Sequence, residues 1–377
     1  MSPYGALGLY GSGANYLGSA GITPSQLANP NLTWESTRQV DLGTEFSVLN
    51  NRLTFSFDYY NKYTYNVLLN VPVPSRSGFT TYLQNYGAVR NKGEEFAIHS
   101  LNIANEHFKW TADFNISFNK NRIEKLASDI TQGASGRNIS ILRQGYPVNS
   151  FYLYKQLSVD PQTGNAIYED VNKDGQITSA DRQIVGNAQP KYTGGFTNTF
   201  TYRNFDLSAF FYFNVGNKIM NMNDFFLVHG GTQANIGFIP RQLQRWITPG
   251  QITDIPRMTT SNIDPATGTA NPAANDSPAN NYGGNVANLS SRYLQDGSFL
   301  RLKTLTIGYT LSPAWLKRAS ITRARIYFQA TNLITWTKYD GLDPEVSSQS
   351  NNQNTAGYDW ATVPQPRTLQ VGANVTF

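Results

Sequence analysis

Apolar and polar side chains alternate with a period of two along most of the chain, which in an extended strand sends every second side chain to the same face. In residues 53–59 the bulky Leu, Phe, Phe and Tyr alternate with Thr, Ser and Asp, and residues 110–118, 300–307 and 369–377 repeat this arrangement. The pattern predicts nine strands, with ends placed to within about two to four residues. They cover 34–49, 52–66, 85–103, 107–121, 190–203, 205–217, 292–311, 320–336 and 366–377.

The connections between these strands alternate between short and long. Asn50-Asn51, residues 104–106 and Arg203-Asn204 are expected to be tight turns, because Asn tolerates the left-handed backbone that hairpins need. Residues 311–318 are expected to form one helical turn beginning at Pro313, and residues 239–246 a short helix. The long connections are rich in Gly, Asn, Pro and Ser, and they cover 67–84, 122–189, 218–291 and 337–365.

Short periplasmic turns in strict alternation with long extracellular loops are typical of outer-membrane barrels. A soluble β-sandwich has the same strand pattern and is the alternative, but loops this long are rare in compact soluble domains. The sequence therefore predicts an all-β protein, a transmembrane antiparallel β-barrel.

The predicted strands are odd in number, whereas single-chain bacterial barrels have an even number, and the first strand would start on the extracellular side. We therefore expect the C-terminal portion of a barrel. Residues 1–33 would be the remainder of an extracellular loop, and residues 34–377 the strands and their loops. The start of the chain has no secretory signal, which a missing first half would explain.

The composition agrees with a membrane barrel and excludes several other classes. Aromatic residues make up 13% of the chain and charged residues only 15%, which is unusual for a soluble surface. No apolar run approaches the roughly 18 residues of a membrane-spanning helix, so a spanning chain would have to be a closed barrel. The absence of cysteine excludes disulfides and thiolate sites. The net charge of +5 comes without a basic run, so nucleic-acid binding is not expected.

Residues 170–181 fit the pattern of a calcium-binding loop. Side-chain oxygens stand at positions 1, 3 and 5 (Asp170, Asn172, Asp174), Gln176 offers its carbonyl at position 7, and Asp181 stands at position 12. We expect a structural Ca²⁺ that fixes a long loop. The alternative is a metal-free turn held by side-chain-to-backbone hydrogen bonds.

Catalysis finds little support in the sequence. The three histidines, His99, His107 and His229, have no partner pattern for a triad or a zinc site. Gly11-Ser12-Gly13 follows no predicted strand, so a phosphate-binding loop is not expected there.

Five short sequence motifs occur in a definite order. Residues 29–35 (NPNLTWE) lead to 41–43 (DLG), and residues 85–95 (NYGAVRNKGEE), 170–175 (DVNKDG) and 293–303 (YLQDGSFLRLK) follow. Through these motifs, residues 29–377 resemble the C-terminal half of the SusC/RagA family of TonB-linked outer-membrane proteins.

The resemblance implies a 22-stranded barrel filled by an N-terminal plug, energised through TonB and covered by a SusD-like surface lipoprotein. It implies import of oligosaccharides or oligopeptides, with a periplasmic C-terminus and no chemistry on the substrate. In this class an aromatic end such as Phe377 serves as a signal for the barrel-assembly machinery; the alternative is an apolar residue facing outer-membrane lipid.

Five loop aromatics are candidates for contact with a ligand or with the lid protein, because aromatic faces stack on sugar rings and peptides; packing within the loops is the alternative. They are Trp246, Tyr282, Tyr339, Tyr358 and Trp360. Other functions that remain open are another TonB-dependent receptor, such as one for iron chelates, a secreted glycan-binding adhesin and, more weakly, a glycan-cleaving enzyme.

Overall fold

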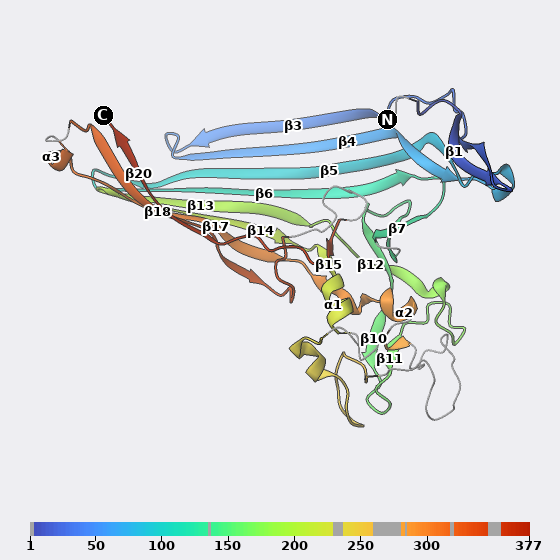
Figure 1. Cartoon of the computed structure of the whole chain (residues 1–377). Helices are drawn as coiled ribbons and strands as arrows, with labels where there is room; N and C mark the ends of the chain where they lie inside the picture. Colours follow the sequence, from blue (N-terminus) through green and yellow to red (C-terminus); the bar gives the residue numbers. More distant parts are fainter. Residues whose placement is uncertain are drawn as a thin grey trace.

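The main feature of the computed structural model is a nine-stranded antiparallel sheet in which neighbours in the sequence are neighbours in space (Figure 1). The structure describes residues 4–134, 137–228, 237–258, 280–282, 285–316, 320–345 and 356–377. The strands are β3 (Ser36–Val48), β4 (Leu53–Pro72), β5 (Thr81–Ala104), β6 (Phe108–Lys125), β13 (Tyr192–Tyr202), β14 (Phe205–Val215), β17 (Phe299–Thr310), β18 (Arg323–Thr337) and β20 (Thr368–Thr376). All nine predicted strands are confirmed. Within the described residues the sheet is open, with β3 and β20 at its edges.

Two of the predicted spans were wrong in extent. Residues 67–84 were predicted to be a long loop, but β4 runs on to Pro72 and β5 starts at Thr81, leaving only η1 (Ser75–Ser77) and its flanks between them. The apolar alternation continues there through Val67, Leu69 and Val71, which supports pairing with β5. The span 292–311 is interrupted, because β16 (Leu294–Asp296) leaves the large sheet and pairs with β15 (Lys218–Asn221).

The short connections are the tight turns that the sequence predicts. Asn50 and Asn51 have φ values of 55° and 62°, and Arg203 has a φ of 52°, the left-handed conformation that Asn tolerates best. The turn at 104–106 is closed by Asn105, whose side-chain oxygen accepts hydrogen bonds from the backbone N–H groups of His107 and Phe108. The predicted helical turn is α3 (Pro313–Leu316), with Pro313 in its first position.

At the opposite end of the sheet from α3, the long connections fold into small elements of their own (Figure 1). Residues 122–189 form β7 (Ile130–Ala134), β8 (Arg137–Leu142), β9 (Ser150–Tyr154), β10 (Gln156–Val159), β11 (Ala166–Tyr168), η2 (Ser179–Asp181) and β12 (Arg182–Asn187). Residues 218–293 contribute β15, α1 (Met222–Leu227), η3 (Pro240–Gln244), α2 (Asn285–Asn288) and η5 (Ser291–Tyr293), and the last loop contributes β19 (Tyr358–Asp359). We call these three folded connections the loop assembly. Within residues 1–33, β1 (Leu9–Tyr16) and β2 (Ser19–Gln26) form a hairpin, and the assignment of that segment to an extracellular loop stays a prediction.

The helices that the structure describes are short, and none of them is both long and apolar enough to cross a membrane.

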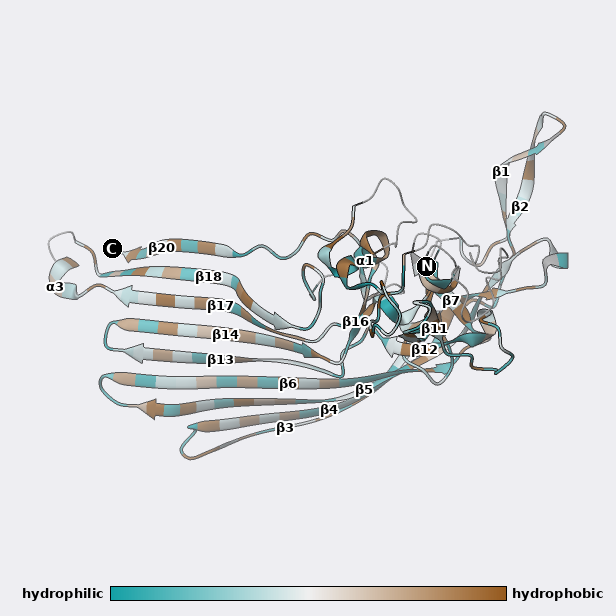
Figure 2. Ribbon diagram, turned by 90° about the horizontal axis from the view of Figure 1, so that it is seen from below, coloured by the Kyte–Doolittle hydropathy of each residue, from teal (hydrophilic) through white to brown (hydrophobic). Residues whose placement is uncertain are grey.

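The two faces of the large sheet differ in chemistry, as the alternating colours along the strands in Figure 2 show. The register lines up side chains across neighbouring strands. One row runs through Phe46, Phe55, Ile98, Phe114, Phe196 and Phe211. We call the face with this apolar row the outer face. The next row, on the inner face, contains Ser47, Thr54, His99, Asp113 and Thr197. Apolar outward and polar inward is the arrangement of a membrane barrel wall.

Candidate functional site: the inner face and the loop assembly

One hydrophobic core contains residues from all three connections of the loop assembly. Ile139, Phe151 and Leu153 come from the first connection, Met220, Met222, Phe225 and Tyr293 from the second, and Tyr358 from the third. Every one of these side chains is at most 8% exposed. Because burial of apolar side chains is the main stabilising contribution, the three connections are expected to behave as one folded body.

A three-stranded sheet holds the same body together through its backbone. β15 pairs antiparallel with β16 and parallel with β19, where Met220 lies opposite Tyr358. β19 contains only two residues, so it depends on β15 for its hydrogen bonds. The third connection is thereby fixed to the second.

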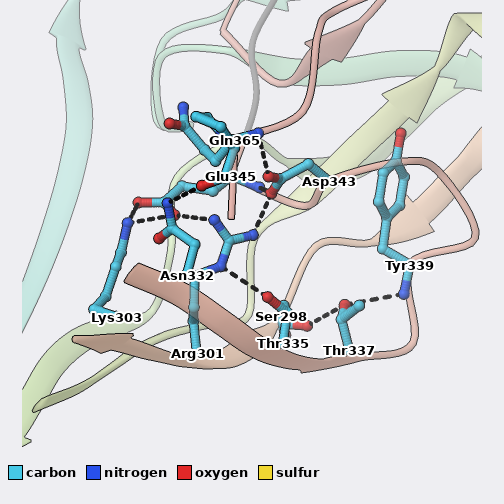
Figure 3. A network of polar contacts seen from close by, with 11 residues as sticks. Ser298, Arg301, Lys303, Asn332, Thr335, Thr337, Tyr339, Asp343, Glu345 and Gln365 are labelled. Carbon is cyan, nitrogen blue, oxygen red and sulfur yellow. Dashed lines mark hydrogen bonds and ion pairs between the residues drawn. The ribbon is translucent and has the colours of Figure 1, made fainter. Parts of the chain in front are cut away.

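A buried network of charges fixes the third connection to the inner face of the sheet (Figure 3). Arg301 on β17 forms ion pairs with Asp343 and with Glu345, the latter at 2.8 Å, and Lys303 lies 2.7 Å from Glu345. The side chains of Arg301 and Asp343 are 3% and 4% exposed. The Arg301 guanidinium also donates to the hydroxyl of Thr335 on β18. We call this group the Arg301 network.

Asp343 is the centre of the Arg301 network. Its carboxylate also accepts hydrogen bonds from the backbone N–H groups of Glu345 and Gln365, each at 2.9 Å. Burial acts to raise the pKa of Asp343, but the hydrogen bonds from Arg301 and from these two N–H groups outweigh it and hold the pKa below its usual value. Asp343 therefore stays charged at neutral pH. A polar cavity of about 320 Å³ adjoins the network, bounded by Arg301, Asn332, Asp343, Gln365 and Arg367 among others.

A second buried carboxylate, Asp224 on α1, has the opposite electrostatic character. Arg241 lies 2.8 Å from it and Gln295 donates a hydrogen bond to it at 3.0 Å. Burial is nevertheless the largest influence and raises the pKa of Asp224 above its usual value. Arg241 is shared with Asp254 at 3.3 Å and Asp340 at 3.7 Å, so one guanidinium joins the second and third connections.

The inner face carries a pair that the sequence did not suggest. His99 Nδ1 lies 2.6 Å from a carboxylate oxygen of Asp113, directly opposite on β6. Both side chains are about half exposed. The sequence alone does not reveal this pair, because partners across a sheet are separated in sequence by the strand lengths. His229 lies outside the described residues.

The predicted calcium loop has a closed conformation. The Asp170 carboxylate accepts hydrogen bonds from the backbone N–H groups of Lys173 and Gly175, and the Asn172 and Asp174 side chains accept from residues two positions on. Gly175 has a φ of +81°, which suits the sharp turn at position 6 of such loops. Asp181 is fully buried and accepts from the N–H groups of Val171 and Thr178.

The donor types of this loop fit a calcium ion. Three carboxylates, one side-chain amide and one backbone carbonyl are the hard oxygen ligands that Ca²⁺ prefers. Among the described residues, no group of three or more His, Cys, Asp or Glu side chains converges closely enough to be a metal site by itself. The calcium hypothesis therefore stays a prediction, as does its metal-free alternative.

The five candidate aromatics divide into buried and half-buried residues. Tyr282, Tyr339 and Tyr358 are 2%, 5% and 1% exposed, and the Tyr339 hydroxyl donates to Asp359 at 2.7 Å. Burial and this hydrogen bond raise the pKa of Tyr339. The Trp246 indole is half-buried against Gly164 and donates to the Pro161 carbonyl.

Trp360, also half-buried, packs on Phe226 at 5.5 Å between ring centroids. The structure thus gives all five aromatics partners within the loop assembly, and contact with a ligand or a lid stays a prediction. Phe377, directly after β20, is 85% exposed at the end of the sheet away from the loop assembly.

Comparison with known proteins gives consistent results. The family model "TonB dependent receptor-like, beta-barrel" matches residues 3–333. "TonB-dependent receptor P3" of Formosa agariphila is 33% identical over the whole chain, which corresponds to 38% of that protein. "TonB-dependent receptor SusC" of Bacteroides thetaiotaomicron is 28% identical over 93% of the chain and 32% of its own length.

Solved structures agree with the sequence relatives. The "Structure of the RagAB peptide transporter" is 27% identical with a TM-score of 0.78, over 99% of this chain and 39% of that one. The RagAB peptide importer in the "open-open" state gives 26% identity and a TM-score of 0.79. The chain thus spans less than two fifths of the length of these relatives.

Proposed function

Because the chain belongs to the TonB-dependent receptor-like β-barrels and is of the SusC/RagA type, we propose that the whole protein imports oligosaccharides or oligopeptides across the outer membrane. The energy would come through TonB. The observation that carries this proposal is the match of nearly the whole chain to a peptide transporter at a TM-score of 0.78. The apolar outer face and polar inner face of the sheet support a place in the barrel wall.

In this proposal the described residues supply part of the wall and of an extracellular binding chamber. The inner face lines the passage, and the loop assembly stands over it as one body, fixed to the wall by the Arg301 network. A SusD-like surface lipoprotein would cover this chamber, as the relation to SusC suggests. The relatives are named receptors and transporters, and we propose that the protein moves its substrate without altering it.

The remaining predicted features have definite roles in this proposal. Ca²⁺ held by residues 170–181 would fix the first connection of the loop assembly. Trp246 and Trp360 are the aromatics best placed for ligand or lid contact, since their side chains are only half-buried. Phe377 would lie on the periplasmic side as an assembly signal.

The proposal is tested with the full-length gene. A deletion strain is grown on single oligosaccharides and on oligopeptides, and uptake of labelled versions is measured after complementation. The expected result is loss of growth and uptake on one of these classes, with co-purification of a surface lipoprotein from outer-membrane fractions. Normal growth on both classes, together with a defect only on ferric chelates, would replace the proposal by the iron-chelate alternative.

A further inference from the structure

Two lysines lie directly opposite each other on the outer face, at the loop end of the sheet. Lys92 on β5 is paired in register with Lys120 on β6, and both side chains are exposed. Like charges directly opposite in an antiparallel pair destabilise the sheet. Among the described residues, none forms an ion pair with either lysine.

Two further cations extend the pair. Arg122 follows Lys120 on the same face of β6, and Lys191 precedes β13, the next strand along the sheet. The aliphatic part of the Lys191 side chain packs against Gly216. A Cβ atom at Gly216 would lie 2.7 Å from Cγ of Lys191, so a larger residue at position 216 would displace the lysine. We call Lys92, Lys120, Arg122 and Lys191 the basic patch.

The basic patch borders two adjoining depressions of the surface, of about 330 Å³ and 510 Å³, which share Asn119, Lys120 and Lys191. Glu94 is the carboxylate residue that lines the first depression, and none lines the second. Other cations close by are already paired. Arg90 lies 3.1 Å from Glu124, and Lys218, at the rim of the second depression, lies 3.6 Å from Asp296. The basic patch is thus distinguished by charge that has no described partner.

The height of the basic patch on the wall follows from the register. The outer face has one aromatic row through Phe108 and Tyr202 at the turn end, and another through Phe118 and Tyr192 toward the loops. The ten residues of strand between these rows span about 34 Å, which at a strand tilt of about 40° is about 25 Å of height, the usual thickness of the apolar band. Lys120 stands two residues beyond Phe118, about 5 Å above that band.

We propose that the basic patch binds the phosphate groups of a lipid headgroup in the membrane leaflet on the loop side. The position immediately above the apolar band is where headgroups lie, and the Tyr59 and Phe118 rings in the first depression offer apolar contact below them. Lysines act as compact point charges for phosphate. This lipid-binding site is separate from the transport passage. It rests on the proposed function in one respect only, namely that the leaflet on the loop side is the outer leaflet of the outer membrane.

A transported substrate is a less suitable occupant, because the register places the basic patch on the outer face and not on the face that lines the passage. Most carboxylates of the neighbouring strands lie on the other face: Asp41, Asp58, Glu95 and Asp113 belong to inner-face rows and are exposed there. On the outer face of β5 and β6, Glu94 lines the first depression and Glu124 is paired with Arg90. A phosphate bound at the basic patch would therefore lie on the lipid-facing side of the sheet.

The test uses the full-length protein in detergent, with bisphosphorylated lipid A as the probe and native mass spectrometry as the readout. The variant Lys92→Gln/Lys120→Gln/Lys191→Gln is compared with the native protein. A basic residue near an anionic lipid surface increases the binding affinity roughly fivefold, so the affinity of the triple variant for the lipid is expected to fall about a hundredfold. The matched control is Lys62→Gln, which removes an exposed lysine from the inner face of β4, opposite Asn91.

Further measurements distinguish a lipid headgroup from free inorganic phosphate as the bound anion. Dephosphorylated lipid A should bind weakly, millimolar inorganic phosphate should not displace the lipid, and the triple lysine-to-arginine variant should keep binding. Heat-modifiable migration on gels verifies that each variant is folded. Equal loss of binding in Lys62→Gln, undiminished binding of the dephosphorylated lipid, or displacement by inorganic phosphate alone would each overturn the proposal.

Discussion

Replacing Arg301 by Met should release the third connection of the loop assembly from the barrel wall. The change removes the cation that joins β17 to Asp343 and Glu345 while keeping a side chain of similar length. Breaking a buried ion pair by removing one partner typically costs about 3–5 kcal/mol, because a buried charge is left uncompensated. Here the cost should be near the lower value, about 3 kcal/mol, since Glu345 keeps Lys303 and Asp343 keeps two backbone N–H donors.

The assay is amide hydrogen exchange of the full-length protein, followed at Glu345 and Gln365, whose N–H groups donate directly to Asp343. A loss of about 3 kcal/mol in local stability accelerates exchange by about a hundredfold or more. Lys303→Met is the control. Lys303 is 24% exposed and leaves Arg301 in place, so its loss should change exchange by less than about fivefold. The reasoning is refuted if Arg301→Met leaves exchange at both amides unchanged, or if the two variants behave alike.

Three further predictions concern the loop assembly. Burial raises the pKa of Asp224 in the folded protein, so the stability that its protonated form contributes is complete below the unfolded pKa and is lost as pH rises through the folded pKa. Proteolysis of the second connection should therefore speed up as pH rises above about 4. Asp224→Asn should abolish that trend. A chelator should accelerate cleavage within residues 170–181 if Ca²⁺ is bound there, and equal cleavage with and without Ca²⁺ would contradict the site. Tyr358→Ala, at a position 1% exposed, should cost about 3–5 kcal/mol and expose the third connection to protease, whereas unaltered protease resistance would show that the shared core does not hold it.

The strands of the wall could be predicted from the sequence because each of them carries its own periodic pattern. A period of two over ten or more residues is typical of a strand with two different faces and of hardly any other secondary structure, and Asn50 and Asn105 mark the turns. One failure was local, since the alternation at residues 67–71 was assigned to a loop although it continues β4. The other occurred where pairing depends on distant residues. β16 (from residue 294) left the large sheet because β15 (from residue 218), far earlier in the sequence, offers it a partner.

The loop assembly could not be predicted for the same reason. Its core combines Phe151, Met220, Tyr293 and Tyr358 from three connections, and none of these residues lies in a periodic run long enough to reveal a buried face. The Arg301 network is equally non-local, since residue 301 binds residues 343 and 345. The sequence shows that the long loops contain several aromatic residues. It does not show that these residues are buried, because their burial depends on contacts between the loops.

The carboxylates on the inner face also help to fix the register that the apolar pattern sets. Asp58, Glu95 and Asp113 belong to inner-face rows at the height of the apolar band. A slip of one residue in any strand would turn its side chains to the other face and bring such a carboxylate against lipid, at a cost of up to about 2 kcal/mol each. The same slip would turn Lys92 or Lys120 into the passage. A slip of one residue would therefore reverse the faces on which these carboxylates and lysines lie, and the membrane penalises that reversal.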